Sequence, residues 1–420
     1  MAERPPRNMT DYEAEYAGSR WDRPARFNFA IDVVDRWASE RPDAPAMLHC
    51  DDRGNRKVYS WRELAERSIH AALFLRDLGL RPGDGVFTML PRLAEWWILA
   101  LGCMRANLVL MPGTTMLTAK DVRYRLELGR ARAVVTTAEH LSKFEAGAHA
   151  DVIGWICIDE APAPWVRFRT QTVDGARAAE FPDTAADDRM LVYFTSGTTG
   201  MPKMVPQTHA SYGIGHGVTG KYWLDLGPDD VHFTLSDTGW AKCAWGKVYG
   251  PWSQGACSVV YDFRGRFEAK ALLDLLARDK VSTFCAPPTA WRAIVLEDLT
   301  KFKFPAPVEA WVIKYSNCMG FTMKRLDTLT STPPPKAAAK LFWAVNKRGV
   351  AELTLNPFES LSPPSRVWTY GVNRDVRQLN RGPNRYWNVV FPSRVLPAAP
   401  VWLAPSSATR PKTLLTLYSA

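Results

Sequence analysis

The apolar positions of the first 305 residues follow two kinds of pattern. Some stretches repeat apolar residues every three or four positions, which is typical of an amphipathic helix; the predicted helices cover residues 27–37, 60–79, 92–104 and 268–278, and another begins at residue 118. Other stretches are short apolar runs typical of buried strands, and they cover residues 86–90, 108–111, 133–136, 152–157, 191–194, 231–235 and 281–285. Because strands and helices alternate, we predict an α/β fold with mainly parallel βαβ sheets covered by helices.

Polar residues mark several of the element boundaries. Ser60, followed three positions later by Glu63, is a capping box that predicts a helix start, and Thr118 is a second cap. Residues 161–188 are poor in pattern and rich in Pro, Ala and Asp. They are predicted to form an irregular connection with at most one strand.

The alternating pattern stops near residue 306. Residues 311–420 contain 12 of the 31 prolines, and apart from a short helical pattern over residues 337–346 their apolar residues recur at neither period. Such a segment cannot easily build a packed core. We therefore expect a folded domain over residues 1–306 and an irregular or disordered tail over residues 307–420. Our hypothesis is that the tail is translated from a shifted frame or a broken gene; the alternative is a genuine basic, proline-rich tail.

The formal net charge of +10 suggests a nucleic-acid or membrane-surface partner, but its distribution argues against both. Residues 311–420 contain 15 Lys and Arg against 4 Asp and Glu, a balance of +11, whereas residues 1–310 contain 38 against 39, a balance of −1. No basic stripe with interleaved aromatic residues occurs before the tail. We expect small-molecule partners, with no nucleic acid and no membrane.

The cysteines and the N-terminus predict a location in the cytoplasm. Seven scattered cysteines without a C-x-x-C pair favour reduced, buried thiols over disulfides or a zinc site. The first 16 residues have no apolar core for a signal peptide and carry too many acids for a transit peptide. The most apolar stretch, residues 96–111, is too short to span a bilayer and contains Arg105.

A loop rich in small and hydroxyl residues follows the predicted strand at residues 191–194. Gly197 and Gly200 let main-chain N–H groups converge on an anion, and Lys203 supplies a positive charge. Hydroxyl donors are added by Ser196, Thr198 and Thr199. Lys203 follows Met201 and Pro202, so the loop is not the P-loop of nucleotidases. We interpret it as a phosphate-binding loop of another kind; the alternative is a Gly/Ser/Thr-rich surface turn.

The sequence T-S-G-T-T-G-M-P-K of residues 195–203 resembles the signature loop of the AMP-forming (adenylate-forming) acyl-CoA synthetases. Met204 stands where many members have glycine and resembles their medium-chain branch. The resemblance covers residues 21–305 and implies the large N-terminal synthetase domain, with ATP, Mg²⁺ and the co-substrate CoA as ligands. It implies that ATP phosphates are bound by Thr195, Ser196, Gly197, Thr198, Thr199, Gly200 and Lys203. Lys203 and Thr198 would act in catalysis, and no metal-ligating residue is predicted.

Two further blocks resemble segments that line the acid site of these enzymes. The block S-D-T-G-W at residues 236–240 implies that Gly239 and Trp240 shape the acyl pocket, although Trp240 and Trp245 could both be core residues. The segment A-P-P-T at residues 286–289 implies substrate binding by Thr289, which could instead cap a helix. His209 is interpreted as a first-turn helix residue without a catalytic role.

The resemblance implies activation of a medium-chain or aromatic carboxylic acid. ATP and the acid would give an acyl adenylate and pyrophosphate, and CoA would then displace AMP. One alternative is an adenylating domain with another acceptor, such as a carrier protein. Another is a non-catalytic nucleotide-binding remnant, because the Y-G-x-T-E block of the family is not found: Tyr370 and Gly371 are followed by Val372, Asn373 and Arg374. We expect this chain to be inactive for that reason.

Overall fold

The structure is a computed structural model, and its described residues form two compact units. Side chains are described for residues 8, 11–20, 22–170, 181–195, 201–265, 267–294 and 296–297, except that of residue 12, and backbone alone for three strands over residues 308–315, 321–329 and 367–369. One unit is Trp21–Arg264, and the other combines Met1–Arg20 with Gly265–Ala420. The boundary near residue 306 expected from the sequence stays a prediction.

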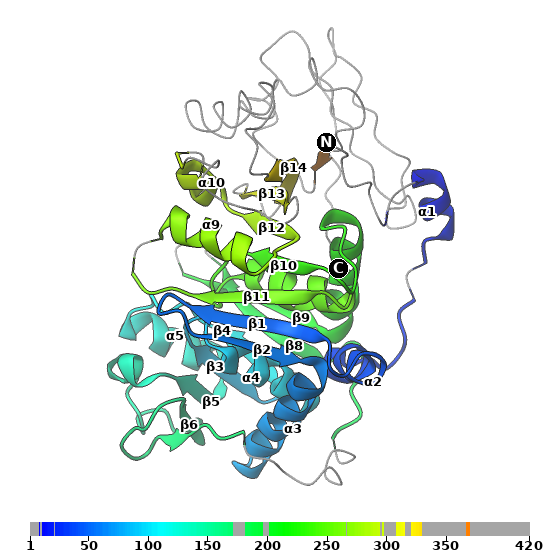
Figure 1. Cartoon of the computed structure of the whole chain (residues 1–420). Helices are drawn as coiled ribbons and strands as arrows, with labels where there is room; N and C mark the ends of the chain where they lie inside the picture. Colours follow the sequence, from blue (N-terminus) through cyan, green and yellow to red (C-terminus); the bar gives the residue numbers. More distant parts are fainter. Residues whose placement is uncertain are drawn as a thin grey trace, which may run out of the picture. The chain divides into compact units, whose positions relative to one another are not determined.

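The unit Trp21–Arg264 contains a seven-stranded sheet (Figure 1). The strand order is β7-β6-β5-β3-β4-β8-β9. All neighbours are parallel except β8 and β9, which pair antiparallel. The bounds are β3 (Gly85–Met89), β4 (Val109–Pro112), β5 (Ala131–Thr136), β6 (Gly154–Cys157), β7 (Val166–Arg167), β8 (Arg189–Thr195) and β9 (Lys203–Thr208). The predicted parallel α/β sheet is confirmed.

The same unit contains a second run of four strands in the order β10-β11-β1-β2. Their bounds are β1 (Pro45–Asp51), β2 (Arg56–Ser60), β10 (Val231–Thr234) and β11 (Cys257–Asp262). β1 and β11 are distant in sequence but lie side by side as a parallel pair (Figure 1). The turn from β1 to β2 is held by the Asp51 carboxylate, which accepts hydrogen bonds from the backbone N–H groups of Arg53 and Asn55.

Two of the helices described in the first part of this unit, α3 and α5, begin at the caps predicted from the sequence. The helices of this part are η1 (Ala30–Asp35), α2 (Arg36–Glu40), α3 (Trp61–Asp77), α4 (Ala94–Arg105), α5 (Ala119–Gly129) and η2 (Ala138–Lys143). The Ser60 hydroxyl accepts from the backbone N–H of Glu63 at the start of α3, and Thr118 forms a full capping box with Asp121 at the start of α5.

Two helical runs of mixed geometry lie in the second half of the unit. The first is η4 (His209–Ile214), α6 (Gly215–Val218) and η5 (Thr219–Trp223), and the second is α7 (Ala241–Ala244), η6 (Trp245–Tyr249) and α8 (Gly250–Ser253). The segments η4, η5 and η6 are π-helical. π-helical turns are rare and occur often at functional sites.

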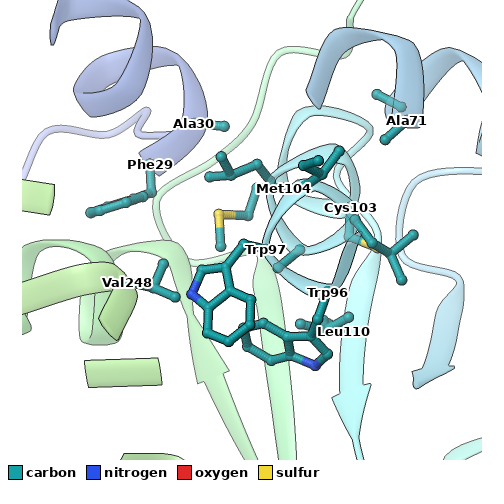
Figure 2. Packing of buried hydrophobic residues seen from close by; sticks show 14 of the residues in the cluster. Phe29, Ala30, Ala71, Trp96, Trp97, Cys103, Met104, Leu110 and Val248 are labelled. Atoms are coloured by element: carbon teal, nitrogen blue, oxygen red, sulfur yellow. The ribbon is translucent and has the colours of Figure 1, made fainter. Parts of the chain in front are cut away.

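The core explains why the apolar pattern has these two periods. Every residue of α4 except Glu95 is buried, as expected for a helix that is apolar on all sides. Successive side chains of a strand point to opposite faces, so in β3 Val86 packs in the cluster of α4 while Phe87 packs in the cluster of α5. The α4 cluster also contains Val260 of β11, so α4 packs against strands of both sheets. Figure 2 shows Trp96 and Trp97 of α4 in this cluster, near Val248.

The other unit contains two helices after residue 265 and strands that extend beyond residue 306. The helices are α1 (Tyr12–Gly18), α9 (Ala269–Arg278) and α10 (Pro288–Ile294), and the strands are β12 (Thr283–Ala286), β13 (Val308–Tyr315), β14 (Phe321–Leu329) and β15 (Val367–Thr369). β12 and β13 are parallel, and β14 pairs antiparallel with β13 and with β15. The sequence predicts an irregular chain after residue 306. The structure instead has three paired strands there, β13, β14 and β15, which the apolar pattern of the sequence does not reveal.

Candidate functional site

The predicted phosphate-binding loop connects two antiparallel strands at one edge of the seven-stranded sheet. Thr195 at the end of β8 pairs with Lys203 at the start of β9. The loop therefore leaves the carboxyl end of β8, which is parallel to its neighbour β4. In parallel α/β sheets, ligands bind beyond the carboxyl ends of the strands. The other predicted phosphate ligands, Ser196, Gly197, Thr198, Thr199 and Gly200, lie outside the described residues.

Thr195 and Lys203 are positioned at the two ends of this loop. Lys203 is exposed, and no carboxylate in the described part of the chain lies within ion-pair distance of it. The Tyr124 hydroxyl of α5 donates to the carbonyl of Pro202 at 3.0 Å and fixes the exit of the loop. The Lys203 charge is therefore available to an anion held by the loop.

The S-D-T-G-W block is fixed to the ends of β3 and β4. The Thr238 hydroxyl donates to the carbonyl of Leu90, directly after β3, at 2.6 Å. A Cβ on Gly239 would lie 2.3 Å from the backbone nitrogen of Thr114, which follows β4. Since β4 pairs in parallel with both β3 and β8, this block and Thr195, where the phosphate-binding loop begins, lie at the same carboxyl end of the sheet. The structure thus places Gly239, Trp240, Thr195 and Lys203 at the same end of one sheet.

Arg92 holds the S-D-T-G-W block in place and was missed by the sequence analysis. Its guanidinium lies 3.6 Å from the Asp237 carboxylate, donates to the carbonyls of Tyr261 and Phe263, and stacks on the Phe263 ring at 4.1 Å. These contacts join the start of α4 to the end of β11. A single arginine at the entry of a nearly all-apolar helix was the only signal in the sequence.

The two tryptophans of this region have different environments. Trp240 is 48% exposed, so it is no core residue, whereas Trp245 is 2% exposed and packs beside His216. The acyl-pocket interpretation therefore stays open for Trp240, and the core interpretation applies to Trp245. Trp240 occupies the position before α7, where its carbonyl accepts from the backbone N–H of Cys243.

Two other residues singled out in the sequence lie in ordinary helical positions. Thr289 is exposed in the first turn of α10, one residue inside the helix rather than at its cap. It belongs to the other compact unit. His209 is fully buried in the first turn of η4, and neither ring nitrogen has a hydrogen-bond partner among the described residues. Burial lowers the pKa of His209 to about 4, so it is neutral at pH 7.

The described residues offer no protein site for Mg²⁺. No group of three His, Cys, Asp or Glu side chains gathers in the described ranges. No helix of the described ranges has the length and apolar character needed to cross a membrane.

Comparison with known proteins identifies the sequence pattern. The family model described as AMP-binding enzyme matches residues 34–352, so the match runs past residue 306. The protein named acyl-coenzyme A synthetase ACSM3, mitochondrial, from Mus musculus is 37% identical over 311 residues, which cover 71% of this chain and 53% of that protein. The Mus musculus protein named acyl-coenzyme A synthetase ACSM5, mitochondrial, is also 37% identical, over 308 residues. The predicted resemblance to acyl-CoA synthetases is confirmed, and the chain spans about half the length of these relatives.

Solved structures share the fold. The acetoacetyl-CoA synthetase from Streptomyces lividans superposes with a TM-score of 0.59 at 24% identity, covering 66% of this chain and 45% of that one. The anthranilate CoA ligase AuaEII in complex with anthranoyl-AMP gives a TM-score of 0.58 at 23% identity, covering 67% of this chain and 54% of that one. The predicted architecture of the synthetase N-terminal domain is confirmed.

The predicted cytoplasmic location is wrong. The relatives named above are mitochondrial proteins by name, and this finding overturns the prediction. The prediction depended on the composition of 16 residues and on unpaired cysteines. The six described cysteines are buried. Buried thiols are compatible with any reducing compartment, so they could not distinguish between the two locations.

Proposed function

We propose, because the chain belongs to the AMP-binding enzyme family, that it carries the nucleotide- and acid-binding part of an enzyme that activates a carboxylic acid with ATP. The acid would become an acyl adenylate and then a CoA thioester. One observation carries this proposal: Thr195 at the end of β8 and the S-D-T-G-W block beside the ends of β3 and β4 lie at the same carboxyl end of one parallel sheet, although Lys203 and Ser236 are 33 positions apart in sequence. By the names of its relatives we propose a mitochondrial location.

Adenylation requires a weak carboxylate nucleophile to be positioned against the α-phosphorus of ATP. The leaving pyrophosphate must also be neutralised, and no covalent enzyme intermediate is needed. We propose that Lys203 supplies the charge to the pyrophosphate and that Ser196, Thr198 and Thr199 donate hydroxyl hydrogen bonds. Thr195, Gly197 and Gly200 would let the backbone N–H groups approach it. The exposed, unpaired position of Lys203 in the described chain supports this role.

The acid is proposed to bind on the S-D-T-G-W side of the edge. Gly239 lies against the backbone of Thr114, so the chain passes close to the end of β4 here. Trp240 is the one large exposed aromatic side chain in the described part of the chain. A half-exposed indole offers apolar area to a medium-chain or aromatic acid.

We propose that this chain binds ATP and an acid but does not turn them over by itself. The Y-G-x-T-E block of the synthetases is not found in its sequence, where Tyr370 and Gly371 are followed by Val372. Groups that act together in catalysis cannot be removed singly without a large loss. Mg²⁺ would arrive with the ATP phosphates rather than in a protein cage.

The test is carboxylate-dependent release of pyrophosphate by the purified protein. ATP, Mg²⁺ and either octanoate or benzoate are supplied, with and without CoA, and the binding of ATP and of each acid is measured by calorimetry. We expect ATP and the acid to bind. We expect the rate of pyrophosphate release with acid to equal the background rate measured without acid. Acid-dependent turnover would overturn the inactivity, and failure to bind ATP would overturn the proposed function. If turnover occurs, thioester formation with CoA or with a carrier protein identifies the acceptor.

A further inference from the structure

Lys247 is a buried lysine without a polar partner in the described part of the chain. It lies in η6 and is 1% exposed. Its ammonium nitrogen has no hydrogen-bond partner among the described residues. Burial of an unpaired charge is costly, so such a group in a native structure calls for an explanation.

Two aromatic rings surround the Lys247 amine. Its Nζ lies 5.3 Å from the ring centroid of Phe233 and 5.7 Å from that of Trp97. Figure 2 shows Trp97 next to Val248, the residue after Lys247. Aromatic faces attract a cation but offer no strong acceptor to its three N–H groups. The rings therefore hold the amine in place and leave its hydrogen-bonding capacity unused.

Lys247 is linked by sequence and by electrostatics to the block proposed to bind the acid. It lies seven positions after Trp240, in the helical run that begins at Ala241 directly after this residue. Phe233 belongs to β10, which ends directly before the S-D-T-G-W block. The charge of Lys247 interacts with those of Arg92 and Asp237, the pair that fixes this block.

No carboxylate in the described residues is free to compensate Lys247. Asp237 is the one carboxylate among its charged neighbours there, and Asp237 is already paired with Arg92. The remaining titratable neighbours in the described residues are the buried thiols of Cys50 and Cys243 and the buried His232, none of which supplies a carboxylate. Burial lowers the pKa of Lys247 to about 8. Lys247 therefore has no anionic partner of its own in the described residues, and a bound ligand could supply one.

We infer that Lys247 binds the far end of the acid and that this acid carries a second carboxylate. The inference rests on the proposed function, which places the acid beside Trp240. A dicarboxylic acid would bring the missing charge and acceptor to the amine. A monocarboxylic acid of the same length would leave the buried N–H groups unpaired, and sites of that kind reject the analogue that lacks the polar group.

The experiment compares the binding of matched acids by calorimetry in saturating ATP. The probes are the C4, C6, C8 and C10 straight-chain diacids and the monoacids of equal length. The proteins are the wild type, Lys247→Met, Lys247→Arg and the control Lys120→Met, which removes an exposed charge. For at least one length, the wild type and the control should prefer the diacid at least ten-fold. In Lys247→Met this preference should disappear, and Lys247→Arg should retain part of it.

The possible outcomes separate this inference from the proposed function. Binding of monoacids as tight as that of diacids at every length would overturn the inference alone, and so would an unchanged preference in Lys247→Met. If Lys247 only packed between aromatic rings, Lys247→Met would change the affinities for the diacid and the monoacid equally. The ratio of the two affinities would then be the same as in the wild type. Failure of every acid to bind the wild type would overturn the proposed function together with the inference.

Discussion

Gly239 is the residue of the candidate site whose replacement has the clearest structural consequence. Its backbone lies so close to Thr114 that an added Cβ would be 2.3 Å from the Thr114 nitrogen and 2.5 Å from its Cα. Both are backbone atoms, so they cannot move aside as a flexible side chain would. The S-D-T-G-W block would have to shift away from the end of β4.

We expect Gly239→Ala to destabilise the protein by roughly 1–3 kcal/mol, as overpacking does, and to weaken acid binding about ten-fold, or 1.4 kcal/mol. Chemical denaturation and calorimetry measure the two effects. The control is Gly217→Ala, where the added Cβ would meet only Ser253 side-chain atoms at 3.7 Å. Equal behaviour of the two variants would show that the close approach at Gly239 is unimportant.

Arg105 provides a test of the buried helix α4. Its side chain is 2% exposed, ion-pairs with Asp35, and donates to the Ser68 hydroxyl at 2.7 Å. Removing one partner of a buried ion pair costs roughly 3–5 kcal/mol; because Asp35 is 37% exposed, we expect about 2–3 kcal/mol for Arg105→Met. The control Arg123→Met breaks the half-exposed pair with Glu145 and should cost less than about 1 kcal/mol. Similar losses in urea unfolding would contradict this account.

Sequence reasoning identified the residue types of the site better than their surroundings. Trp240 and Trp245 have the same local composition, but one is exposed and the other is core, because which face of a helix is covered depends on elements distant in sequence. Arg92 and Lys247 were missed for the same reason. Each is one cation in an apolar stretch, and its contacts come from β10, β11 or α4.

The helical runs 209–223 and 241–253 cross at a pair of glycines. A Cβ added to Gly220 of η5 would lie 2.1 Å from the carbonyl oxygen of Gly250 in α8. Only glycine permits such an approach of two backbones. The crossing therefore fixes how the run that contains Lys247 packs against the run that follows β9.

We expect Gly220→Ala to separate the two runs and to cost about 3 kcal/mol or more, at the upper end of overpacking. The control Gly215→Ala, in the same run, adds a Cβ in open space and should stabilise the helix by up to about 1 kcal/mol. Thermal unfolding of both variants measures the difference. An unchanged melting temperature for Gly220→Ala would contradict the tight crossing.

Element boundaries were predictable where a cap or an apolar run is strong. Ser60 and Thr118 start helices as predicted, and the parallel strands β3, β4, β5, β6 and β8 lie at the apolar runs. The strand β9 was missed because Lys203–Thr208 contains Pro206 and has no fully buried residue, so neither period is visible. Its pairing with β8 comes from the hairpin and not from its own composition. The hairpin of β1 and β2 was missed although Asp51 and Asn55 mark its turn.

Over the whole molecule, buried histidines should make stability depend on pH. Burial lowers the pKa of His209 to about 4 and those of His216 and His232 to about 3, from an ordinary value of 6.5. Their folded-state pKa is below the unfolded one, so between pH 6.5 and 4 the unfolded chain binds more protons. Their contribution is thus complete above pH 6.5 and is lost as the pH falls.

We expect the free energy of unfolding to fall between pH 7 and pH 5.5 by roughly 1 kcal/mol for each of these histidines. Urea titrations at the two pH values measure the change, and His209→Gln should reduce it by about a third, because His209 is one of three such histidines. A stability that is constant or increases over this range would contradict the burial of neutral histidines.

The molecule as a whole was predictable in class and family but not in its division into units. The alternation of periods predicted the α/β fold, and residues 195–203 pointed to the family that the comparison confirms. The division at Arg264 is not visible in composition, because the residues on both sides of it have ordinary polar character. The strands after residue 306 depend on pairing between segments, which no local pattern encodes.

The most direct test of the account is the affinity for ATP of the wild type, of Lys203→Ala and of Lys120→Ala, measured by titration calorimetry with Mg²⁺ present. Lys203 lies at the start of β9 beside the loop, whereas Lys120 is exposed in α5. The Lys120→Ala control removes the same charge at a position away from the loop. A lost charge-assisted hydrogen bond is worth about 1.5–3 kcal/mol, so Lys203→Ala should bind ATP at least about ten-fold more weakly. Lys120→Ala should bind as the wild type does. Equal affinity of all three proteins, or no binding by the wild type, would contradict the assignment of the phosphate-binding loop.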